Sequence, residues 1–469
     1  MIISKTFLDK PKNIIEFGNF LFLLGVFFLA SAPFISLFFL FPCLIIGTLK
    51  RKDNFFEDKW NYPFILVSIL MILSCVVQTI NRSNIGLNYN YNFSFIGLLN
   101  WLPLFWCFWG FQPYLFTKSQ RERCIKFVLA GSIPLLISCL GQYYFNWYGP
   151  FEFLNGFVIW FQKPIANNSQ GLTGFFNNQN YAGMWLSIIF YFGLAFTVVR
   201  PEEKTKKIIA FIVTFFIGLT TFLTYSRNSI LSIFVWIQFF LKSKKISIFI
   251  LFFALALFLV IFVNDLYVCT NFNRNNFLER ENILMIIFQK LSVTVRELLP
   301  SGLYNKINKD IISEGIQSSP RFLIWSVAIK SILERKLFGW GAGSFPLVID
   351  SKSIVNQSFQ HTHNLPLEVA FNFGIPSALI LTISLLLLTY KNFIIEFSLK
   401  NSLKFSKENI FDTAWKTSVG IFLFSHLFDI TYFDSRISVL AWILLSGMRN
   451  ILREYNTRRI NPRDFCEDT

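Results

Sequence analysis

Long apolar segments alternate with short polar segments along most of this chain. An α-helix needs roughly 20 predominantly apolar residues to cross about 30 Å of hydrocarbon, and run after run approaches that length. The ten-residue alternation that is typical of outer-membrane barrels does not occur. The pattern therefore predicts an all-α polytopic membrane protein with about 12 transmembrane helices. The predicted spans are residues 17–30, 34–49, 63–80, 95–116, 127–145, 181–199, 208–225, 230–241, 246–263, 375–390, 410–430 and 437–448.

Lysine and arginine residues cluster in every second gap between these spans. The clusters lie at 5–12, 50–52, 118–126, 200–207, 242–245, 391–407 and 449–459. Positive loops stay on the cytoplasmic side of a membrane. We therefore expect a multi-pass protein of the bacterial inner (plasma) membrane with both termini in the cytoplasm.

The composition agrees with this interpretation. Hydrophobic residues make up 54% of the 469 residues, and there are 60 phenylalanines. A net charge of +16 is typical of proteins with a nucleic-acid partner, but here the cations fall in the gaps and do not share one amphipathic face. We expect the bilayer as a partner and no nucleic acid. The seven cysteines contain no CxxC pair, so neither a disulfide framework nor a zinc site is indicated.

One long polar stretch interrupts the apolar pattern. It divides the chain into residues 1–264 with helices 1–9, a large periplasmic loop at 265–365 between helices 9 and 10, residues 366–448 with helices 10–12, and a cytoplasmic tail at 449–469. Two of the three histidines lie in this loop. The loop is the natural place for a functional site.

The last third of this loop shows a helical pattern. Ser318-Ser319-Pro320 is typical of a helix start. The apolar residues that recur at helical spacing after it are Leu323, Ile324, Val327, Ala328 and Ile332. This helix should lie on the outer membrane surface or pack over the spans. Gly339, Gly341 and Gly343 would end it in a flexible turn whose backbone amides could approach a ligand.

Ionisable side chains gather on the predicted outer face. They are Arg227, Arg321, His361, His363, His426, Asp429, Asp434 and Arg436. Such groups are costly near a membrane and are usually kept for a function. Arginine binds phosphate with two parallel charge-assisted bonds, and histidine suits general-base work on a sugar hydroxyl. Together they fit transfer from a lipid pyrophosphate.

Simpler interpretations of each residue remain open. Arg227 could be an interfacial anchor, and Arg321 could be solvated, although the start of a helix is a poor place for a cation. His361 and His363 could be ordinary loop histidines, because an HxH pair without a further ligand is a weak indication of a metal site. His426 and Asp429, three positions apart, could form a structural hydrogen bond on one helical face.

Four segments resemble the O-antigen ligase family, which also includes polysaccharide polymerases. His363-Asn364 is followed after nine residues by Gly374-Ile375-Pro376. The other three segments are GFFNNQNYAGMWLS from Gly174 to Ser187, TYSRNSIL from Thr224 to Leu231, and RFLIWSVAIKSILERKLFGWGAGSF from Arg321 to Phe345. They occur in the family's order, and the resemblance covers most of the chain.

This resemblance implies a metal-independent ligase that needs no cofactor. Its donor would be an undecaprenyl-diphosphate-linked glycan, and its acceptor a lipid A-core or another glycan. Arg227 and Arg321 would hold the pyrophosphate, and His363 would position or deprotonate the acceptor hydroxyl. Further substrate contacts would come from Asn364, His361, Asn180, Gly341 and Gly343. The donor supplies the energy, so no Walker motif is needed, and none is present.

The chain also departs from the family pattern. Leu379 stands where a second glycine is expected, and Lys336 where a proline is common. The segment SHLFDITYFDSRISVLAW is similar to cyanobacterial members, some of which have been called bicarbonate transporters. We therefore keep an O-antigen polymerase and a bicarbonate transporter as alternatives to the ligase. A transporter should place polar groups near the bilayer midplane, whereas here they gather at one face.

Overall fold

The computed structural model describes residues 13–51, 53–80, 89–90, 92–165, 170–199, 204–241, 320–351, 359–400 and 410–460. Helices dominate these ranges, as the sequence predicted. The sheet found within them is a small antiparallel pair of β1 (Phe151–Phe153) and β2 (Val158–Trp160). The all-α class is therefore confirmed for the described part of the chain.

The helices of the first half are α2 (Ile14–Phe28), α3 (Pro33–Leu49), α4 (Tyr62–Ile80), α5 (Asn92–Leu98), α6 (Leu102–Gly110), α7 (Lys118–Tyr144), α8 (Gln179–Val198), α9 (Lys204–Leu223) and α10 (Arg227–Leu241). Two short 3-10 turns, η1 (Phe55–Glu57) and η3 (Gln112–Tyr114), join them. The second half contains α15 (Pro320–Glu334), α16 (Phe345–Ser351), α17 (Leu365–Phe373), α18 (Ile375–Lys400), α19 (Ile410–Ser425) and α20 (Ser435–Ile460).

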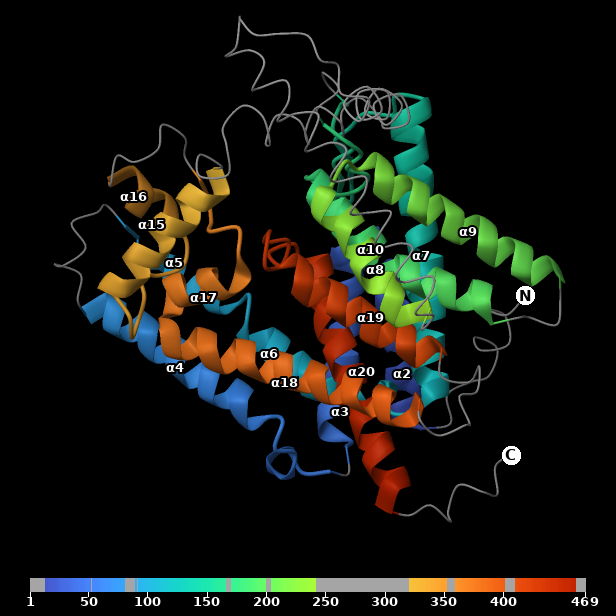
Figure 1. The fold of residues 1–469 in the computed structure, drawn as a ribbon, viewed down its shortest axis with the longest axis horizontal. Helices are drawn as coiled ribbons and strands as arrows, with labels where there is room; N and C mark the ends of the chain where they lie inside the picture. Colours follow the sequence, from blue (N-terminus) through green and yellow to red (C-terminus); the bar gives the residue numbers. More distant parts are fainter. Residues whose placement is uncertain are drawn as a thin grey trace, which may run out of the picture.

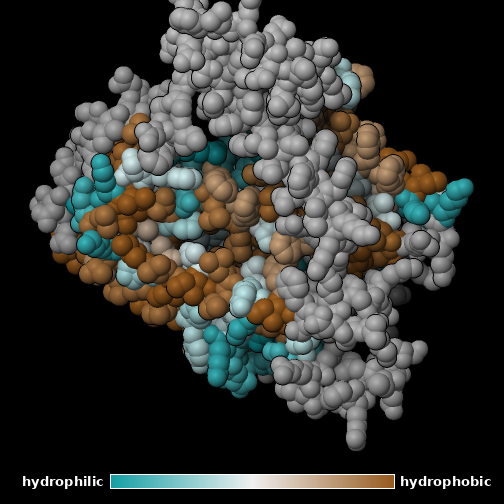
Figure 2. Space-filling model, viewed as in Figure 1, coloured by the Kyte–Doolittle hydropathy of each residue, from teal (hydrophilic) through white to brown (hydrophobic). Residues whose placement is uncertain are grey.

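The helices support a multi-pass membrane protein. Within the described ranges, 6 helical segments are long and apolar enough to cross a bilayer, one of them Asn92–Gly110, which contains α5 and α6. Three shorter apolar helices accompany them. Figure 2 shows apolar side chains over α4 and α18, with hydrophilic side chains below them and at the free end of α9. The predicted count of twelve spans is not confirmed, because the predicted span 246–263 lies outside the described residues.

The helices differ from the predicted spans in two ways: one predicted span is divided, and some helices extend beyond the predicted bounds. The predicted span 95–116 is divided into α5, α6 and η3, because Pro103 occupies the first turn of a new helix after Trp101. In contrast, α7 begins at Lys118, where Thr117 and Gln120 form a capping box, and α20 continues to Ile460. The apolar pattern marks only the membrane part of these helices, whereas their charged turns are helical as well.

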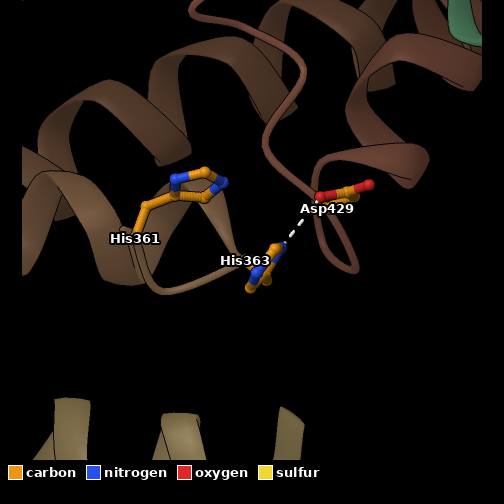
Figure 3. Close-up of side chains that lie close together, drawn as sticks. All are labelled: His361, His363 and Asp429. Atoms are coloured by element: carbon orange, nitrogen blue, oxygen red, sulfur yellow. Dashed lines mark hydrogen bonds and ion pairs between the residues drawn. The ribbon is translucent and has the colours of Figure 1, made fainter. Parts of the chain in front are cut away.

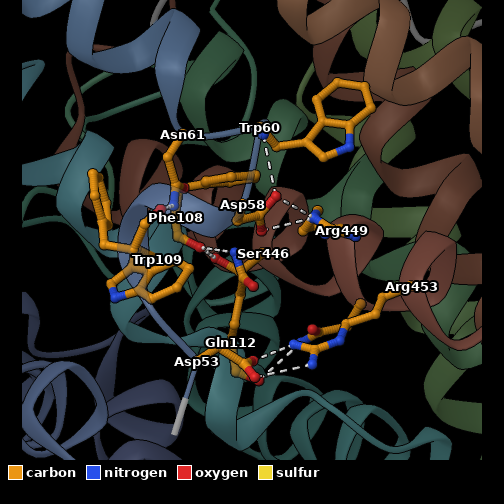
Figure 4. Close-up of polar contacts among 12 residues, drawn as sticks. Asp53, Asp58, Trp60, Asn61, Phe108, Trp109, Gln112, Ser446, Arg449 and Arg453 are labelled. Carbon is orange, nitrogen blue, oxygen red and sulfur yellow. Dashed lines mark hydrogen bonds and ion pairs between the residues drawn. The ribbon is translucent and has the colours of Figure 1, made fainter. Parts of the chain in front are cut away.

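Ion pairs join several helices at one end of the bundle. The buried Arg121 of α7 donates to Asp412 of α19 and to Glu454 of α20, each at 2.8 Å. Near them, Arg449 pairs with Asp58, as Figure 4 shows. Arg453 similarly pairs with Asp53 (Figure 4). Several of the predicted cytoplasmic clusters therefore meet at the same end.

The opposite end gathers the segments that the sequence placed on the outer face. The connection 426–434 joins the end of α19 to the start of α20, whereas Arg121 contacts Asp412 near the start of α19 and Glu454 near the end of α20. The connection and Arg121 therefore lie at opposite ends of this helix pair. The start of α10 is fastened at the end of α19 by Asn228, whose side chain donates to the carbonyl of Ser425 at 2.9 Å. Arg436 donates to the carbonyl of Phe175 at 3.1 Å and holds the segment before α8.

The last third of the predicted loop packs over the spans. The apolar face predicted for α15 is buried at Ile324, Val327, Ala328 and Ile332. Gln78, near the end of α4, donates to backbone carbonyls on both sides of this unit, at Phe338 and Asn372. Figure 1 shows α15, α16 and α17 together beside the end of α4. Of the two predicted positions for this helix, packing over the spans is correct.

Candidate functional site

His363 lies against Asp429 at the end of the bundle just described. The Nδ1 atom of His363 is 3.0 Å from Oδ1 of Asp429 (Figure 3). The ring of His361 lies beside them, with its centroid 4.6 Å from that of His363. The contact joins the segment before α17 to the connection between α19 and α20.

The backbone of His363 is in a left-handed conformation. Its φ is 54°, a region that residues with a side chain rarely adopt. The preceding residue holds this turn, because the Thr362 amide donates to the Glu368 carboxylate and its hydroxyl donates to the Asn364 carbonyl, both at 2.9 Å. Strain that a surrounding network maintains in this way is common at functional sites.

Asn364 fastens the histidine turn to the rest of the protein. Its side-chain oxygen caps α17 by accepting from the Leu367 amide at 3.0 Å, and its side-chain amide donates to the Leu427 carbonyl at 2.9 Å. The next amide, that of Leu365, donates to the carbonyl of His426. Asn364 therefore positions His363. The predicted contact of Asn364 with substrate stays a prediction.

Asp429 is buried and has several donors. Its Oδ1 also accepts from the Ile430 amide at 2.9 Å, and its Oδ2 accepts from the side chain of Asn180 at 2.7 Å. Burial alone would raise the pKa of Asp429, but the hydrogen bond and charge of His363 and the charge of Arg321 hold that pKa below its usual value. An ionised carboxylate only accepts, so the Nδ1 atom of His363 carries a proton whether the ring is charged or neutral. In the neutral ring, Nε2 is therefore the nitrogen that can accept a proton.

The charge of Arg321 is one of the causes of the low pKa of Asp429. Arg321 lies half-buried at the start of α15, with its positive charge close enough to stabilise the Asp429 carboxylate. One turn later, the indole nitrogen of Trp325 donates to the Thr362 carbonyl at 3.0 Å, between the two histidines. Residues four apart share a helix face, so this face of α15 looks toward the histidine turn.

Arg227 lies at the same end of the bundle. It is the first residue of α10 and follows Tyr225, whose φ of 52° makes a tight turn between α9 and α10. The helix is fastened by Asn228, and Ser232 contacts the hydroxyl of Ser425 at 2.7 Å. The connection that carries Asp429 starts directly after Ser425. The predicted role of Arg227 in holding pyrophosphate stays a prediction.

His361 provides a neutral imidazole beside His363. The pKa of His361 is lowered to about 4, chiefly by burial and also by the charge of His363, while the charge of Asp429 opposes both effects. His361 is therefore uncharged near neutral pH. It is suited to hydrogen bonding with a sugar hydroxyl, as predicted for a substrate contact.

The three glycines after α15 adopt the backbone expected of them. Their φ values are 63°, 102° and 77° at Gly339, Gly341 and Gly343. The Gly341 amide donates to the Asn372 carbonyl at 3.1 Å, and a Cβ there would lie 2.5 Å from the Ser94 hydroxyl. Gly341 is thus needed for close packing, whereas the Cβ position of Gly343 is open. The predicted ligand contacts at Gly341 and Gly343 remain untested.

The prediction of a hydrogen bond between His426 and Asp429 is wrong. Helix α19 ends at Ser425, so the two residues do not share a helical face. The Nδ1 atom of His426 lies 2.7 Å from the Phe422 carbonyl, and its Nε2 atom lies 3.2 Å from the Thr431 hydroxyl. Burial lowers the pKa of His426 to about 4. This histidine therefore stabilises the connection, while Asp429 turns to His363.

Two residues of the site were not among the predicted ones. Asp429 was predicted to lie on the outer face and to bond to His426, whereas its pairing with His363 depends on folding that brings separate segments together. Glu368 is buried and binds the Thr362 amide and the Asn372 side chain. Burial raises the pKa of Glu368, although these hydrogen bonds oppose the rise. The sequence signal that could have identified Glu368 is an acidic residue among the mainly apolar residues of α17.

Metal-binding atoms come together in the same place. The candidate ligand atoms of His361, His363 and Asp429 lie within 4.8 Å of one another. Two imidazoles and a carboxylate suit a divalent transition metal. However, the carboxylate already accepts from His363, Ile430 and Asn180, and the nearby charge of Arg321 opposes a cation. Both carboxylate oxygens of Asp429 are thus already hydrogen-bonded to protein donors.

Comparison with known proteins gives one family match. The sequence profile of the O-antigen ligase family matches residues 209–382. This segment contains Arg227, Arg321, His361 and His363, while Asn180 and Asp429 lie outside it. No curated protein matches the sequence. The match supports neither a cyanobacterial source nor bicarbonate transport.

Proposed function

We propose that this membrane protein, whose residues 209–382 match the O-antigen ligase family, moves a glycan from undecaprenyl diphosphate to an acceptor sugar. The family indicates a membrane glycosyltransferase of the ligase or polymerase type. The observation that carries the proposal is the contact between His363 and Asp429, with Arg321 beside it. This group contains a base, an orienting carboxylate and an anion-binding side chain.

In the proposed reaction, His363 acts as the general base. Its Nε2 atom takes the proton of the acceptor hydroxyl while the hydroxyl oxygen forms a bond to the anomeric carbon of the donor. The bond from that carbon to the diphosphate oxygen breaks, and undecaprenyl diphosphate leaves with the electron pair. Asp429 stabilises the imidazolium that forms and keeps the ring in place.

Negative charge develops on the leaving diphosphate, so cations beside it lower the barrier. We assign this role to Arg321, because its charge already contributes to the low pKa of Asp429 and a guanidinium can present two parallel donors to phosphate oxygens. Arg227 would bind the same diphosphate from the start of α10. The bond between the sugar and the diphosphate supplies the energy, which fits a reaction without nucleotide, cofactor or metal.

The proposed site opens at the outer, periplasmic end of the helices. The Lys and Arg clusters of the opposite end support this orientation, with both termini in the cytoplasm. There the acceptor would be the lipid A-core in a ligase, or a second lipid-linked glycan in a polymerase. The two activities share donor, base and leaving group, so the ligase is our first proposal and the polymerase its alternative.

A surface-glycan profile tests the proposal. In a deletion strain, wild-type protein should restore long-chain lipopolysaccharide, whereas His363→Ala should not, and polymer should accumulate on the lipid carrier. Single repeat units on the core would instead indicate a polymerase. Equal profiles with and without the wild-type gene would exclude both activities.

A further inference from the structure

An apolar groove runs between α8 and α9. Its volume is about 470 Å³. The apolar side chains that line it are Phe190, Leu194, Phe211, Phe215, Leu219 and Phe222. Among the described residues, no charged side chain contributes to its lining. A groove of this kind suits a hydrocarbon chain.

Small residues explain why the groove exists. The two helices meet closely at Gly193, where a Cβ would lie 2.7 Å from the Thr214 hydroxyl. Farther along α9, Gly218 faces the ring of Phe190, and a Cβ there would lie 3.2 Å from a ring carbon. The missing side chain at Gly218 therefore keeps the floor of the groove open.

In the described part of the chain, the groove lies on the membrane-facing side of α9. Only 28% of the most apolar stretch of α9 is buried, the smallest share among the six candidate spans. Phe211 and Phe215, which line the groove, are 60% and 57% exposed. Figure 1 shows α9 at the edge of the bundle, away from α15 to α17. A lipid can therefore enter the groove sideways from the bilayer.

One end of the groove lies next to the proposed diphosphate site. Phe222 lies in the last turn of α9, and the following turn leads directly to Arg227. That turn is held against α8, because a Cβ at Gly183 would lie within 3.0 Å of side chains of Thr224, Ser226 and Ser229. A hydrocarbon chain in the groove would thus have its polar end at Arg227.

We infer that this groove binds the part of the polyprenyl chain closest to the diphosphate of the donor. The inference rests on the proposed function and names the subsite for the donor lipid. Phe211 and Phe222 are about 17 Å apart along the helix, at about 1.5 Å for each residue, so only part of an undecaprenyl chain fits. The remainder extends into the bilayer. The groove makes transfer depend on the length of the donor lipid.

Filling the groove tests this inference. The full-length protein in nanodiscs is assayed with the same glycan on undecaprenyl diphosphate and on a carrier of two isoprene units. The wild type should have a KM about tenfold lower for the long carrier. Gly218→Leu should raise the KM for the long carrier about tenfold and leave that for the short carrier unchanged. Ile209→Phe adds bulk to an exposed position of α9 outside the groove and should behave as wild type.

A crosslinking measurement identifies the occupant if Gly218→Leu does not fold. A photoreactive amino acid at position 215 should label undecaprenyl diphosphate, and one at position 209 should not. Crosslinks from position 215 to residues 246–263 would overturn the inference, because the chain itself would then fill the groove. Wild-type transfer with equal KM for both carriers would also overturn it while leaving the proposed function intact. Absence of transfer from either carrier would contradict the proposed function itself.

Discussion

The imidazole of His363 and the carboxylate of Asp429 are 3.0 Å apart, although they belong to segments on either side of α17, α18 and α19. The carboxylate is further fixed by Asn180 from α8. The proposed base is thus oriented by a residue outside the matched family segment, which ends at residue 382. The proposed role of Asp429 can therefore be tested by substitution, as that of His363 can.

Replacing Asp429 with asparagine should lower kcat strongly. The amide carries no charge to stabilise the imidazolium, and it can donate to Nδ1 and favour the wrong tautomer of His363. Because general-base assistance is worth about 100-fold to 10,000-fold, we expect a decrease in that range with little change in KM. Steady-state transfer by the purified protein measures it. A kcat within twofold of wild type would remove Asp429 from the mechanism.

Replacing Arg321 with alanine should lower kcat/KM about 100-fold to 1,000-fold, as loss of one donor to a developing anion does elsewhere. Arg321→Lys should recover only part of the activity, because an ammonium keeps the charge but lacks the planar fork. Lys330→Ala is the matched control, since Lys330 lies exposed on the same helix. An equal decrease in kcat/KM for both alanine variants would indicate a general electrostatic effect. Wild-type kcat/KM for Arg321→Ala would show that Arg321 does not bind the diphosphate.

Acid should destabilise the site through His361. Its pKa is lowered from 6.5 to about 4 in the folded protein, so the unfolded chain binds the proton more strongly. The contribution of neutral His361 to the free energy of unfolding is fully present above pH 6.5. It is lost as the pH falls toward 4, because the unfolded chain then binds a proton that the folded protein does not. The low pKa of Asp429 acts in the same direction. The Tm of wild type should therefore fall more between pH 7 and pH 5 than that of His361→Gln.

The control for this measurement is the slope of Tm against pH that remains in His361→Gln. It should be smaller than in wild type but not zero, because buried His426 also has a pKa lowered to about 4. Identical slopes for the two proteins would show that His361 does not titrate as its burial implies.

Chelation should leave transfer unchanged. The oxygens of Asp429 already accept from His363, Ile430 and Asn180, and none of these bonds needs a metal. We expect the same kcat in EDTA as in buffer alone, measured after the protein has been dialysed against the chelator. Loss of activity that added Zn²⁺ restores would instead show that His361, His363 and Asp429 hold a functional ion.

The sequence predicted the helices better than the site. Hydrophobic periodicity was sufficient for α15, whose predicted apolar residues Ile324 and Val327 are buried. It could not show that Pro103 divides one predicted span, since hydropathy does not change there. Charge patterning placed Arg227, His363 and Asp429 on one predicted face of the membrane. Pattern alone cannot place side chains of separate segments within hydrogen-bonding distance.

The left-handed backbone conformation of His363 could not be predicted from the sequence either. A histidine between Thr362 and Asn364 has no intrinsic reason to adopt a φ of 54°. The conformation is imposed by tertiary contacts, namely those of Thr362 with Glu368 and of Asn364 with Leu427. Tertiary contacts of this kind also explain why His426 does not bond to Asp429.

Transfer by purified His363→Ala tests the central claim most directly. The protein is incubated with undecaprenyl-diphosphate-linked glycan and an acceptor sugar, and both the glycosylated acceptor and the released undecaprenyl diphosphate are measured. Wild type should form them in equal amounts, and His363→Ala should form less than about one hundredth as much, because its general base is gone. Transfer by His363→Ala at the wild-type rate would contradict the account.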